Sequence, residues 1–383
     1  MAPIVILGSG LAGYTLAREF RKLDPVTALV IVTRDDGAVY SKPMLSNALA
    51  SARSAAALAS ADAATAATQL NATIVAQREV AAIDAGARTL QFADGERLAY
   101  SKLVLALGAD PIRVPLAGDA VDAVLQVNDL ADYARFRVAI EGAAHVTILG
   151  AGLIGSEFAN DLALSGRKVD VIDPAAWPLG RLVPEPVGRA FAAQLGAAGV
   201  TLRLGTTATA VERRDGGLRV QLADGNTVDT DAVLSAIGLR PRTQLAQAAG
   251  LAVNRGIVVD RQLRASAPDV YALGDCAEVC GQVLPYVMPL MNAARALAKT
   301  LAGEPTEVRY PAMPVVVKTP AAPLTVAPPA PGAPGSWHIA HGADGSLEAS
   351  FVDAQHNLLG FALLGGAPAL RQALTKRLPA VLG

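Results

Sequence analysis

Two glycine motifs are the residues with the clearest chemical potential in this sequence. GSGLAG spans residues 8 to 13 and GAGLIG spans residues 150 to 155, both with the spacing GxGxxG. Such glycines permit a tight turn, let the main chain approach a pyrophosphate, and allow close packing of the next helix, whose N-terminus favours phosphate. The motifs predict two dinucleotide sites, with contacts from Gly8, Ser9, Gly10, Leu11, Ala12 and Gly13, and from Gly150, Gly152 and Gly155.

Each motif stands between a predicted strand and a predicted helix, which is the context that gives it meaning. Ile4 to Leu7 and Val146 to Leu149 are apolar runs typical of strands buried on both faces of a parallel sheet. Helices are predicted after the motifs, and the next strands are predicted at Leu29 to Val32 and Val169 to Ile172. The predicted helical faces carry Ala12, Leu16, Phe20 and Leu23 in the first unit and Phe158, Ala159 and Leu162 in the second.

An acidic residue about 20 residues beyond the glycines is expected to hold a ribose hydroxyl. Asp173 occupies this place in the second unit. A carboxylate there accepts from a free 2′-hydroxyl and repels a 2′-phosphate, so NADH is predicted rather than NADPH. In the first unit the matching residue is Thr33, followed by Arg34, Asp35 and Asp36, and the ribose contact of that nucleotide stays open.

The remaining segments predict helices, strands and a small C-terminal domain. The alanine-rich stretch from Ala48 to Leu70 favours helices and is given no chemistry. Gly and Pro residues near Pro311 mark a boundary, followed by short strands, a proline-rich loop at 328 to 334 and a helix from Ala367 to Leu378. The other predicted strands are Val80 to Ile83, Leu90 to Phe92, Leu103 to Leu107, Val200 to Leu204, Arg219 to Leu222, Ala232 to Ile237, Val315 to Val317, Trp337 to Ala340, Ala349 to Val352 and Leu358 to Leu364.

Composition excludes several classes of function. The 383 residues include 33 Lys and Arg against 34 Asp and Glu, so no overall field attracts nucleic acid or an anionic membrane. Four histidines and two cysteines make a metal site with several ligands improbable, and no metal is predicted. The longest segment without charged residues is rich in proline, so membrane insertion is not predicted. With a strand starting at Ile4 and few cysteines, a cytoplasmic location is expected.

Four motifs in this order resemble the FAD-dependent pyridine nucleotide-disulfide reductase superfamily. They are GSGLAG at 8 to 13, LALGA at 105 to 109, GAGLIGSE at 150 to 157 and SAPDVYALGDCAE at 266 to 278. The resemblance implies FAD at the first glycine motif, a nicotinamide nucleotide at the second, and an FAD contact from Asp275. The sequence departs from the disulfide branch, because YSKPMLSNAL at 40 to 49 holds no cysteine where a redox thiol is expected. Reduced flavin is therefore expected to pass electrons to an external acceptor.

YSKPMLS also resembles a segment of the NADH-dependent reductases of small iron–sulfur and iron–thiolate carriers. This resemblance implies that Lys42 lies beside the isoalloxazine, where a cation stabilises the anionic reduced ring. Glu157, which follows the second glycine motif, is implied to lie near the nicotinamide and flavin. The tail segment KTPAAPLTV at 318 to 326 is most similar to the rubredoxin reductases. Family resemblance further implies FAD contacts from Val80, Val287 and Lys318.

The sequence as a whole predicts an α/β protein with two Rossmann-like dinucleotide-binding domains and a small α+β C-terminal domain. The predicted segments are 1–112 and 241–311 for the FAD-binding domain, 113–240 for the inserted NADH-binding domain, and 312–383 for a domain near the flavin. The resemblance implies that a hydride passes from NADH to FAD and that single electrons then reach rubredoxin, which would feed an acceptor such as an alkane hydroxylase. Lys42, Lys318, Arg240 and Arg242 are alternative docking groups for this acidic iron protein; loss of Lys318 is expected to weaken rubredoxin turnover at low salt.

Three other interpretations compete with rubredoxin reduction. A [2Fe-2S] ferredoxin reductase shares every motif up to the C-terminal domain, so only the tail separates the two. A flavoprotein that senses NADH without rapid turnover is a second possibility. An NADH oxidase or a thiol-disulfide reductase is disfavoured by the missing thiol.

Overall fold

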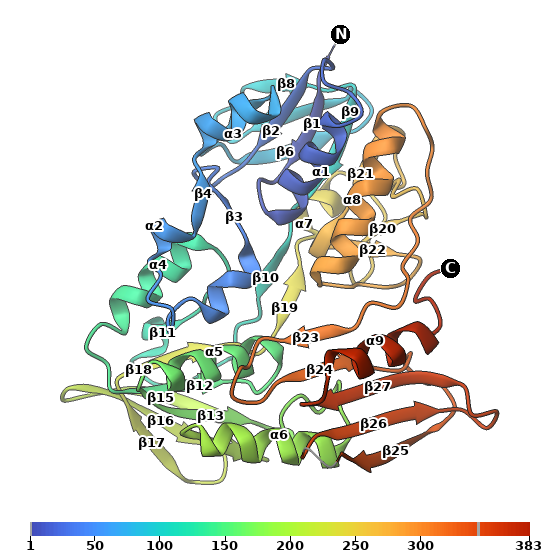
Figure 1. The fold of residues 1–383 in the computed structure, drawn as a ribbon. Coiled ribbons are helices and arrows are strands. Elements are labelled where there is room, and N and C mark those ends of the chain that lie inside the picture. The colour runs from blue at the N-terminus through green and yellow to red at the C-terminus, as the bar shows by residue number, and fades with distance from the viewer. Residues whose placement is uncertain (1, 343–344) are drawn as a thin grey trace.

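The chain folds into two layered α/β parts and a smaller β-rich C-terminal part (Figure 1). In this computed structural model the described residues are 2–342 and 345–383; Met1, Ala343 and Asp344 lie outside them. The blue N-terminal part stands above the green and yellow part, and the orange segments return to the blue part. The red C-terminal part lies beside the green one, so three segments distant in sequence meet in the middle of the molecule.

The first sheet is parallel and takes strands from two distant stretches of the chain. Its order is β21-β9-β1-β2-β5. All four residues of the central strand β1 are buried, as expected where both faces of a parallel sheet are covered. The strand predicted over Leu103 to Leu107 ends at Leu105, before the chain turns at Gly108 with φ +72°. The strands are β1 (Ile4–Leu7), β2 (Leu29–Val32), β5 (Thr73–Val75), β9 (Lys102–Leu105) and β21 (Val270–Ala272).

Helices α1 (Leu11–Arg21) and α8 (Val287–Leu301) pack against each other beside this sheet. The apolar spacing of α1 buries Leu16 and Phe20 completely, as predicted. The prediction was wrong for Leu23, which lies beyond the helix and is 50% exposed. The chain turns there because the Asp24 carboxylate accepts the N–H groups of Val26 and Thr27, and an intervening proline opposes further helix.

The second part is a parallel sheet of order β11-β18-β12-β13-β14, with helices against it. The strand predicted to end at Ile237 ends at Ser235. Its strands are β11 (Val124–Leu125), β12 (His145–Leu149), β13 (Lys168–Asp173), β14 (Val200–Leu204) and β18 (Ala232–Ser235), and its helices are α4 (Leu130–Ala139), α5 (Leu153–Leu164) and α6 (Glu185–Ala197). Figure 1 shows α5 between this sheet and the blue segment that leads into α2.

Smaller sheets and helices complete the two α/β parts. Two antiparallel three-stranded sheets have the orders β6-β7-β8 and β15-β16-β17, and β10 pairs with β19. The strands are β6 (Val80–Asp84), β7 (Thr89–Phe92), β8 (Arg97–Ala99), β10 (Ala109–Pro111), β15 (Ala208–Arg214), β16 (Gly217–Leu222), β17 (Thr227–Thr230), β19 (Leu239–Pro241), β20 (Ile257–Val259) and β22 (Ala277–Val279). Short helices are η1 (Lys42–Asn47), η2 (Val121–Ala123), η3 (Gly274–Cys276) and α7 (Gln244–Ala248).

The alanine-rich stretch is only partly helical, so its prediction needs correction. It contains α2 (Ala55–Leu58) and α3 (Ala63–Leu70), separated by the strand β4 (Ala59–Ala61). β4 pairs with β3 (Val39–Tyr40). A tertiary strand partner overrides the helix preference of alanine there. Helix resumes because Asp62 accepts the N–H of Thr65 and caps α3.

The C-terminal part is an antiparallel sheet of order β23-β24-β27-β26-β25, followed by one helix. Its helix α9 (Pro368–Arg377) is one residue shorter at each end than predicted. The strands are β23 (Val315–Val317), β24 (Leu324–Ala327), β25 (Ser336–His341), β26 (Leu347–Val352) and β27 (Leu358–Leu364). The sheet rests on α6 through β26 and β27.

One hydrophobic core joins three parts of the chain and fixes the position of η1. Leu45 of η1 is packed in the same cluster as Phe158 of α5 and Leu324 of β24. The C-terminal sheet, the second parallel sheet and the η1 segment are therefore held as one unit. Within residues 2–342 and 345–383, none of the helices is both long and apolar enough to cross a membrane.

Candidate redox site

Both glycine turns open into one cavity of about 1690 Å³. The cavity lies between the two parallel sheets, and the C-terminal part closes one side of it through Lys318. The predicted site residues that line it are Gly8, Ser9, Gly10, Leu11, Ala12, Thr33, Arg34, Lys42, Val80, Gly150, Gly152, Glu157, Asp173, Asp275, Val287 and Lys318. Gly13 and Gly155 do not line the cavity. They lie in the helices that follow the turns, where a side chain would collide with the main chain of the turn.

The first glycine turn has the geometry that close approach by a ligand requires. Gly8 has φ +119°, and a Cβ there would lie 2.2 Å from the Ala106 oxygen. A Cβ on Gly13 would lie 1.9 Å from the Gly8 oxygen, whereas one on Gly10 would meet no atom within 4 Å. Gly10 also precedes α1 without any side-chain cap, so N–H groups of the first turn stay available for an anion.

The second glycine turn repeats this arrangement. Gly150 has φ +105°, and its Cβ would lie 2.7 Å from the Ala236 oxygen. A Cβ on Gly155 would lie 1.9 Å from the Gly150 oxygen, and Gly152 precedes α5 with open space around it. The residues of both turns therefore fit the pyrophosphate of a dinucleotide.

Asp173 ends β13 directly below the second turn. Its Oδ2 accepts the N–H of Ala151 at 2.6 Å, and its Oδ1 accepts the N–H of Ala175 at 2.8 Å. These bonds fix the carboxylate at the rim of the cavity, with lone pairs left for a ribose hydroxyl.

The first unit also has a carboxylate, two residues after the position of Thr33 at which the spacing predicts the ribose contact. The hydroxyls of Ser9 and Thr33 lie 2.8 and 2.6 Å from Oδ1 of Asp35, which also accepts the Gly37 N–H at 3.0 Å. Asp35 lines the cavity. A count from the end of β2 points to Thr33, but the loop geometry brings the acidic side chain of Asp35 under the glycine turn.

Lys42 and Asp275 lie close together on the cavity wall, although more than 200 residues separate them in the sequence. Lys42 begins η1 and Asp275 lies in η3; Nζ and Oδ2 are 4.0 Å apart. Nζ donates instead to Oδ1 of Asn128 at 2.7 Å. Burial lowers the pKa of Lys42, and the neighbouring Asp275 carboxylate opposes this effect.

Glu157, Lys318 and Ser46 form a cluster at the junction of all three parts. Lys318 Nζ forms an ion pair with Glu157 Oε2 and donates to Ser46 Oγ at 2.9 Å. Ser46 donates to Glu157 Oε2 at 2.6 Å, and the Lys318 main-chain N–H donates to Oε1 at 3.1 Å. The Glu157 side chain is only 9% exposed. A charge brought by the C-terminal part thus compensates a nearly buried carboxylate on α5.

The other predicted contacts lie on the cavity wall with different surroundings. Val80 starts β6, and Val287 starts α8 and is 40% exposed. The Arg34 guanidinium is 3.9 Å from Asp110 Oδ1. Arg242 donates to the same oxygen at 2.6 Å and to the Leu107 oxygen at 2.9 Å. Arg242, predicted as an alternative docking group, is therefore bound into the cavity wall, whereas Arg240 of β19 is exposed.

Neither cysteine lies on the cavity wall. Cys276 is fully buried, its thiol donates to the oxygens of Leu105 and Leu273, and burial raises its pKa to about 11. Cys280 is exposed, and both thiols are free. Across the described ranges 2–342 and 345–383, no cluster of three or more His, Cys, Asp or Glu side chains has the arrangement of a metal site.

Besides Asp35, three residues of the site were not identified from the sequence. Ser46 lies inside the YSKPMLS motif, and Asp161 follows Glu157 by four residues, on the same face of α5. Asp161 is buried and accepts the N–H groups of Leu49 and Ala50 at 2.8 and 3.0 Å, which fastens the end of η1 to α5. Asn128 carries no sequence signal, because its partner Lys42 is 86 residues away.

The first 300 residues match a known family model. The model described as pyridine nucleotide-disulphide oxidoreductase covers residues 2–298. The chain belongs to this family. The predicted fold class is confirmed, and so is the use of FAD and NADH that the family implies. A second model, described as a rubredoxin binding C-terminal domain, covers residues 307–378.

Full-length relatives and solved structures resemble the chain. It is 51% identical to rubredoxin-NAD(+) reductase of Alcanivorax borkumensis, with 100% of both chains covered. It is 48% identical to the protein of the same name from Acinetobacter baylyi, over 99% of this chain and 98% of the other. The reductase in a covalent putidaredoxin reductase–putidaredoxin complex has a TM-score of 0.88 and 26% identity, over 99% of this chain and 94% of the other.

Proposed function

We propose that this chain is an FAD-dependent NADH:rubredoxin oxidoreductase. One observation carries the proposal: two dinucleotide turns open into a single cavity, and the C-terminal part that matches a rubredoxin-binding model contributes Lys318 to its wall. The full-length similarity to two rubredoxin-NAD(+) reductases supports the same acceptor. We place the flavin on the N-terminal sheet and the nicotinamide nucleotide on the second sheet.

Bound FAD supplies the chemistry that accepts a hydride from NADH and releases single electrons to an iron centre. The turn from Gly8 to Gly13 would hold its pyrophosphate, Asp35 a ribose hydroxyl, and Asp275 the chain toward the ring. Val80, Val287 and Lys318 are proposed as further contacts. Lys42 would provide positive charge beside the ring, which favours the reduced anion.

The second turn and its neighbours would bind and orient NADH. Gly150, Gly152 and Gly155 shape the pyrophosphate site, and Asp173 would accept from the ribose hydroxyls. Its negative charge would repel a 2′-phosphate, so NADPH is the poorer donor. Glu157 is proposed to stand beside the nicotinamide, held in place by Ser46 and Lys318.

Electrons must leave the cavity to an external acceptor. The only two cysteines are Cys276, whose thiol is buried away from the cavity with its pKa raised to about 11, and Cys280 outside the cavity wall. A thiolate is the form that exchanges with disulfides, so neither residue supplies the internal redox relay of a disulfide reductase. This arrangement supports a small iron protein as the oxidant.

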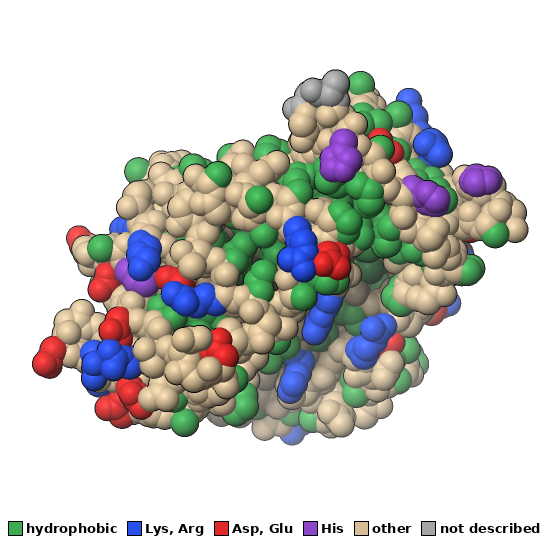
Figure 2. Space-filling view, turned by 90° about the horizontal axis from the view of Figure 1, so that it is seen from below, with side chains coloured by type: hydrophobic (Ala, Val, Ile, Leu, Met, Phe, Trp, Pro, Cys, Tyr) green, Lys and Arg blue, Asp and Glu red, His purple; other side chains and the backbone are tan. Residues whose placement is uncertain are grey.

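The surface charge bears on how such an acceptor would dock. Figure 2 shows Lys and Arg side chains interspersed with Asp and Glu over the face seen there, with hydrophobic side chains exposed between them. Steering of an acidic partner would therefore depend on groups close to the cavity rather than on the net charge of −1. Lys318 offers only part of its charge, because it is paired with Glu157.

A ferredoxin reductase is the second candidate function. It is favoured by the structural similarity to a ferredoxin reductase from Rhodopseudomonas palustris, which has a TM-score of 0.86 and 26% identity over 95% of this chain and 91% of the other. The match of residues 307–378 to a rubredoxin-binding domain favours rubredoxin instead.

The test is reduction of purified iron proteins by the FAD-loaded enzyme. NADH or NADPH is added, and the initial rates of rubredoxin and [2Fe-2S] ferredoxin reduction are followed by visible absorbance. We expect the enzyme to bleach rubredoxin rapidly with NADH and not with NADPH. Faster ferredoxin reduction would favour the second candidate, and bleaching of the flavin with neither protein reduced would remove both acceptors.

The wider assignments are also proposals. We divide the chain into 1–112 and 241–311 for FAD, 113–240 for NADH and 312–383 beside the flavin; the sharing of one sheet by β9 and β21 supports the split FAD domain. We propose a cytoplasmic location and an alkane hydroxylase as the system that rubredoxin supplies. Growth on alkanes after deletion of the gene would test the last assignment.

A further inference from the structure

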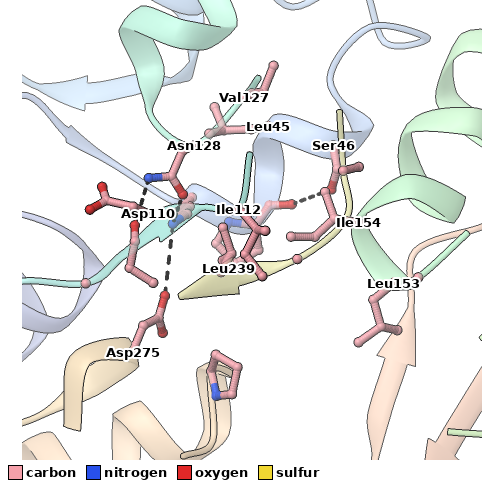
Figure 3. Close-up of a pocket in the computed structure, with 18 of the residues that line it drawn as sticks. Leu45, Ser46, Asp110, Ile112, Val127, Asn128, Leu153, Ile154, Leu239 and Asp275 are labelled. Atoms are coloured by element: carbon pink, nitrogen blue, oxygen red, sulfur yellow. Dashed lines mark hydrogen bonds and ion pairs between the residues drawn. The ribbon is translucent and has the colours of Figure 1, made fainter. Parts of the chain in front are cut away.

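Lys42 is held by a neutral acceptor rather than by a carboxylate. Its Nζ donates to Asn128 Oδ1 at 2.7 Å, whereas Asp275 Oδ2 is 4.0 Å away, beyond hydrogen-bond distance. Figure 3 shows the side chains of Asn128 and Asp275 pointing toward the same space, and a dashed line ends at each of them. Because the hydrogen-bond acceptor of Lys42 is a neutral amide, this hydrogen bond does not neutralise the positive charge of the ammonium group.

The amide of Asn128 has a fixed orientation. Its Nδ2 donates to the oxygen of Ala109 at 2.9 Å, so only Oδ1 can face Lys42. The residue is 7% exposed, and its main-chain N–H donates to Asp132 Oδ2 at 2.9 Å. Asn128 thus joins the segment before α4 to β10 and to η1 through one amide group.

We propose that Asn128 is a positioning residue that holds the Lys42 ammonium at the cavity and keeps its charge available to the flavin. The inference rests on the proposed function, because it takes FAD as the occupant of the cavity. An aspartate at this position would form an ion pair and weaken the field of Lys42, and it would also place a carboxylate against the Ala109 oxygen. An alanine would leave Lys42 without its hydrogen-bond acceptor in a site that already disfavours charge.

The charged groups around Lys42 determine in which direction a substitution shifts the pKa of Lys42. Asp275 of η3, Asp129 and Asp132 at the start of α4 favour the ammonium form, and Arg242 after β19 opposes it. Burial is the largest influence and lowers the pKa of Lys42. Loss of the Asn128 acceptor should lower this pKa further, while an added carboxylate should raise it.

The test is the midpoint potential of bound FAD as a function of pH, measured by reductive titration against a reference dye without NADH or rubredoxin. In the wild-type enzyme, the plot should change slope where Lys42 loses its proton. We expect the change of slope about one pH unit lower in Asn128→Ala, a roughly ten-fold weaker hold on the proton, and about one unit higher in Asn128→Asp. Lys42→Met should lack this feature, and Asn128→Ala should alter nothing further in that background.

Gln126→Ala is the matched control, because Gln126 lies in the same segment and donates to the Ile112 oxygen at 3.4 Å, without lining the cavity. It should behave as wild type. The proposal would be overturned if Asn128→Ala changed the plot of midpoint potential against pH equally with Lys42 present and with Lys42→Met. It would also be overturned if the alanine and aspartate variants moved the change of slope in the same direction. Loss of FAD from both Asn128 variants while Lys42→Met stays loaded would also overturn it. A wild-type chain that binds no FAD would instead refute the proposed function.

Discussion

The ion pair between Lys318 and Glu157 should fasten the C-terminal part to the second α/β part, which contains α5. Lys318 follows β23, and Glu157 lies on α5, so the contact crosses between two separate sheets. Replacing Lys318 by methionine keeps most of the side-chain volume and removes the charge. The Glu157 carboxylate would then keep two hydrogen bonds, from Ser46 and from the main chain of residue 318.

The expected loss in the free energy of unfolding lies between the value for breaking a surface ion pair and the value for breaking a buried one. Breaking a fully buried pair costs about 3–5 kcal/mol, and an exposed pair contributes less than about 1 kcal/mol. Glu157 is 9% exposed and Lys318 is 27% exposed, and the carboxylate stays partly satisfied. We therefore expect Lys318→Met to lower the free energy of unfolding by about 2 kcal/mol.

The assay uses the two tryptophans, which lie in the two parts that the pair connects. Trp177 follows β13, and Trp337 lies in β25 of the C-terminal sheet. Urea unfolding of Trp177→Phe, followed by Trp337 fluorescence, reports on the C-terminal part. Lys299→Met is the control, since Lys299 pairs with Glu304 at 3.5 Å on the surface and should contribute less than about 0.5 kcal/mol.

A double-mutant cycle decides whether the pair itself carries the effect. Glu157→Gln combined with Lys318→Met should cost at least about 1 kcal/mol less than the sum of the single changes. Additivity within about 0.5 kcal/mol would refute the reasoning. A loss of rubredoxin turnover that depends on salt, with stability unchanged, would assign Lys318 to docking instead.

Three further predictions concern the glycine turns, the nucleotide donor and the cysteines. Gly13→Ala should prevent correct folding, since its Cβ would lie 1.9 Å from a main-chain oxygen, whereas Gly10→Ala should keep the circular dichroism spectrum and lose flavin. Asp173→Ser should reduce the preference for NADH over NADPH by about ten-fold in the ratio of kcat/KM, because the carboxylate that repels a 2′-phosphate is gone. At pH 8 the native chain should react with one equivalent of a thiol reagent at exposed Cys280. Cys276 should react only after unfolding, because its thiolate becomes common in the native state only near pH 11, and two rapid equivalents in the native state would contradict this.

Elements with strong local signals could be predicted from the sequence. The strand from Ile4 to Leu7 is a continuous apolar run before a glycine turn, and such a run is typical of a strand with both faces covered. Alanine-rich segments are less informative, because the helix preference of alanine is small enough for a tertiary strand partner to override it. β4 became a strand since β3 lies beside it, and no local pattern contains that fact.

The candidate site shows the same division. Gly8, Gly150 and Asp173 could be located from spacing along the chain, because their roles depend on neighbours within one βαβ unit. Asp35 was displaced from the expected position by a loop, whose path depends on hydrogen bonds to Ser9 and Thr33. Asn128 could not be located at all.

The sequence by itself determined that two dinucleotides bind, where their turns lie, and that the segment from residue 40 to 49 holds no cysteine. These properties depend on residue type and short spacing. Only the tertiary structure decided which polar and charged side chains contact one another: Lys42 with Asn128 and Asp275, and Glu157 with Lys318 and Ser46. These contacts join residues from different parts of the fold. The hydrophobic packing of η1, α5 and the C-terminal sheet into one core sets the distances between these side chains.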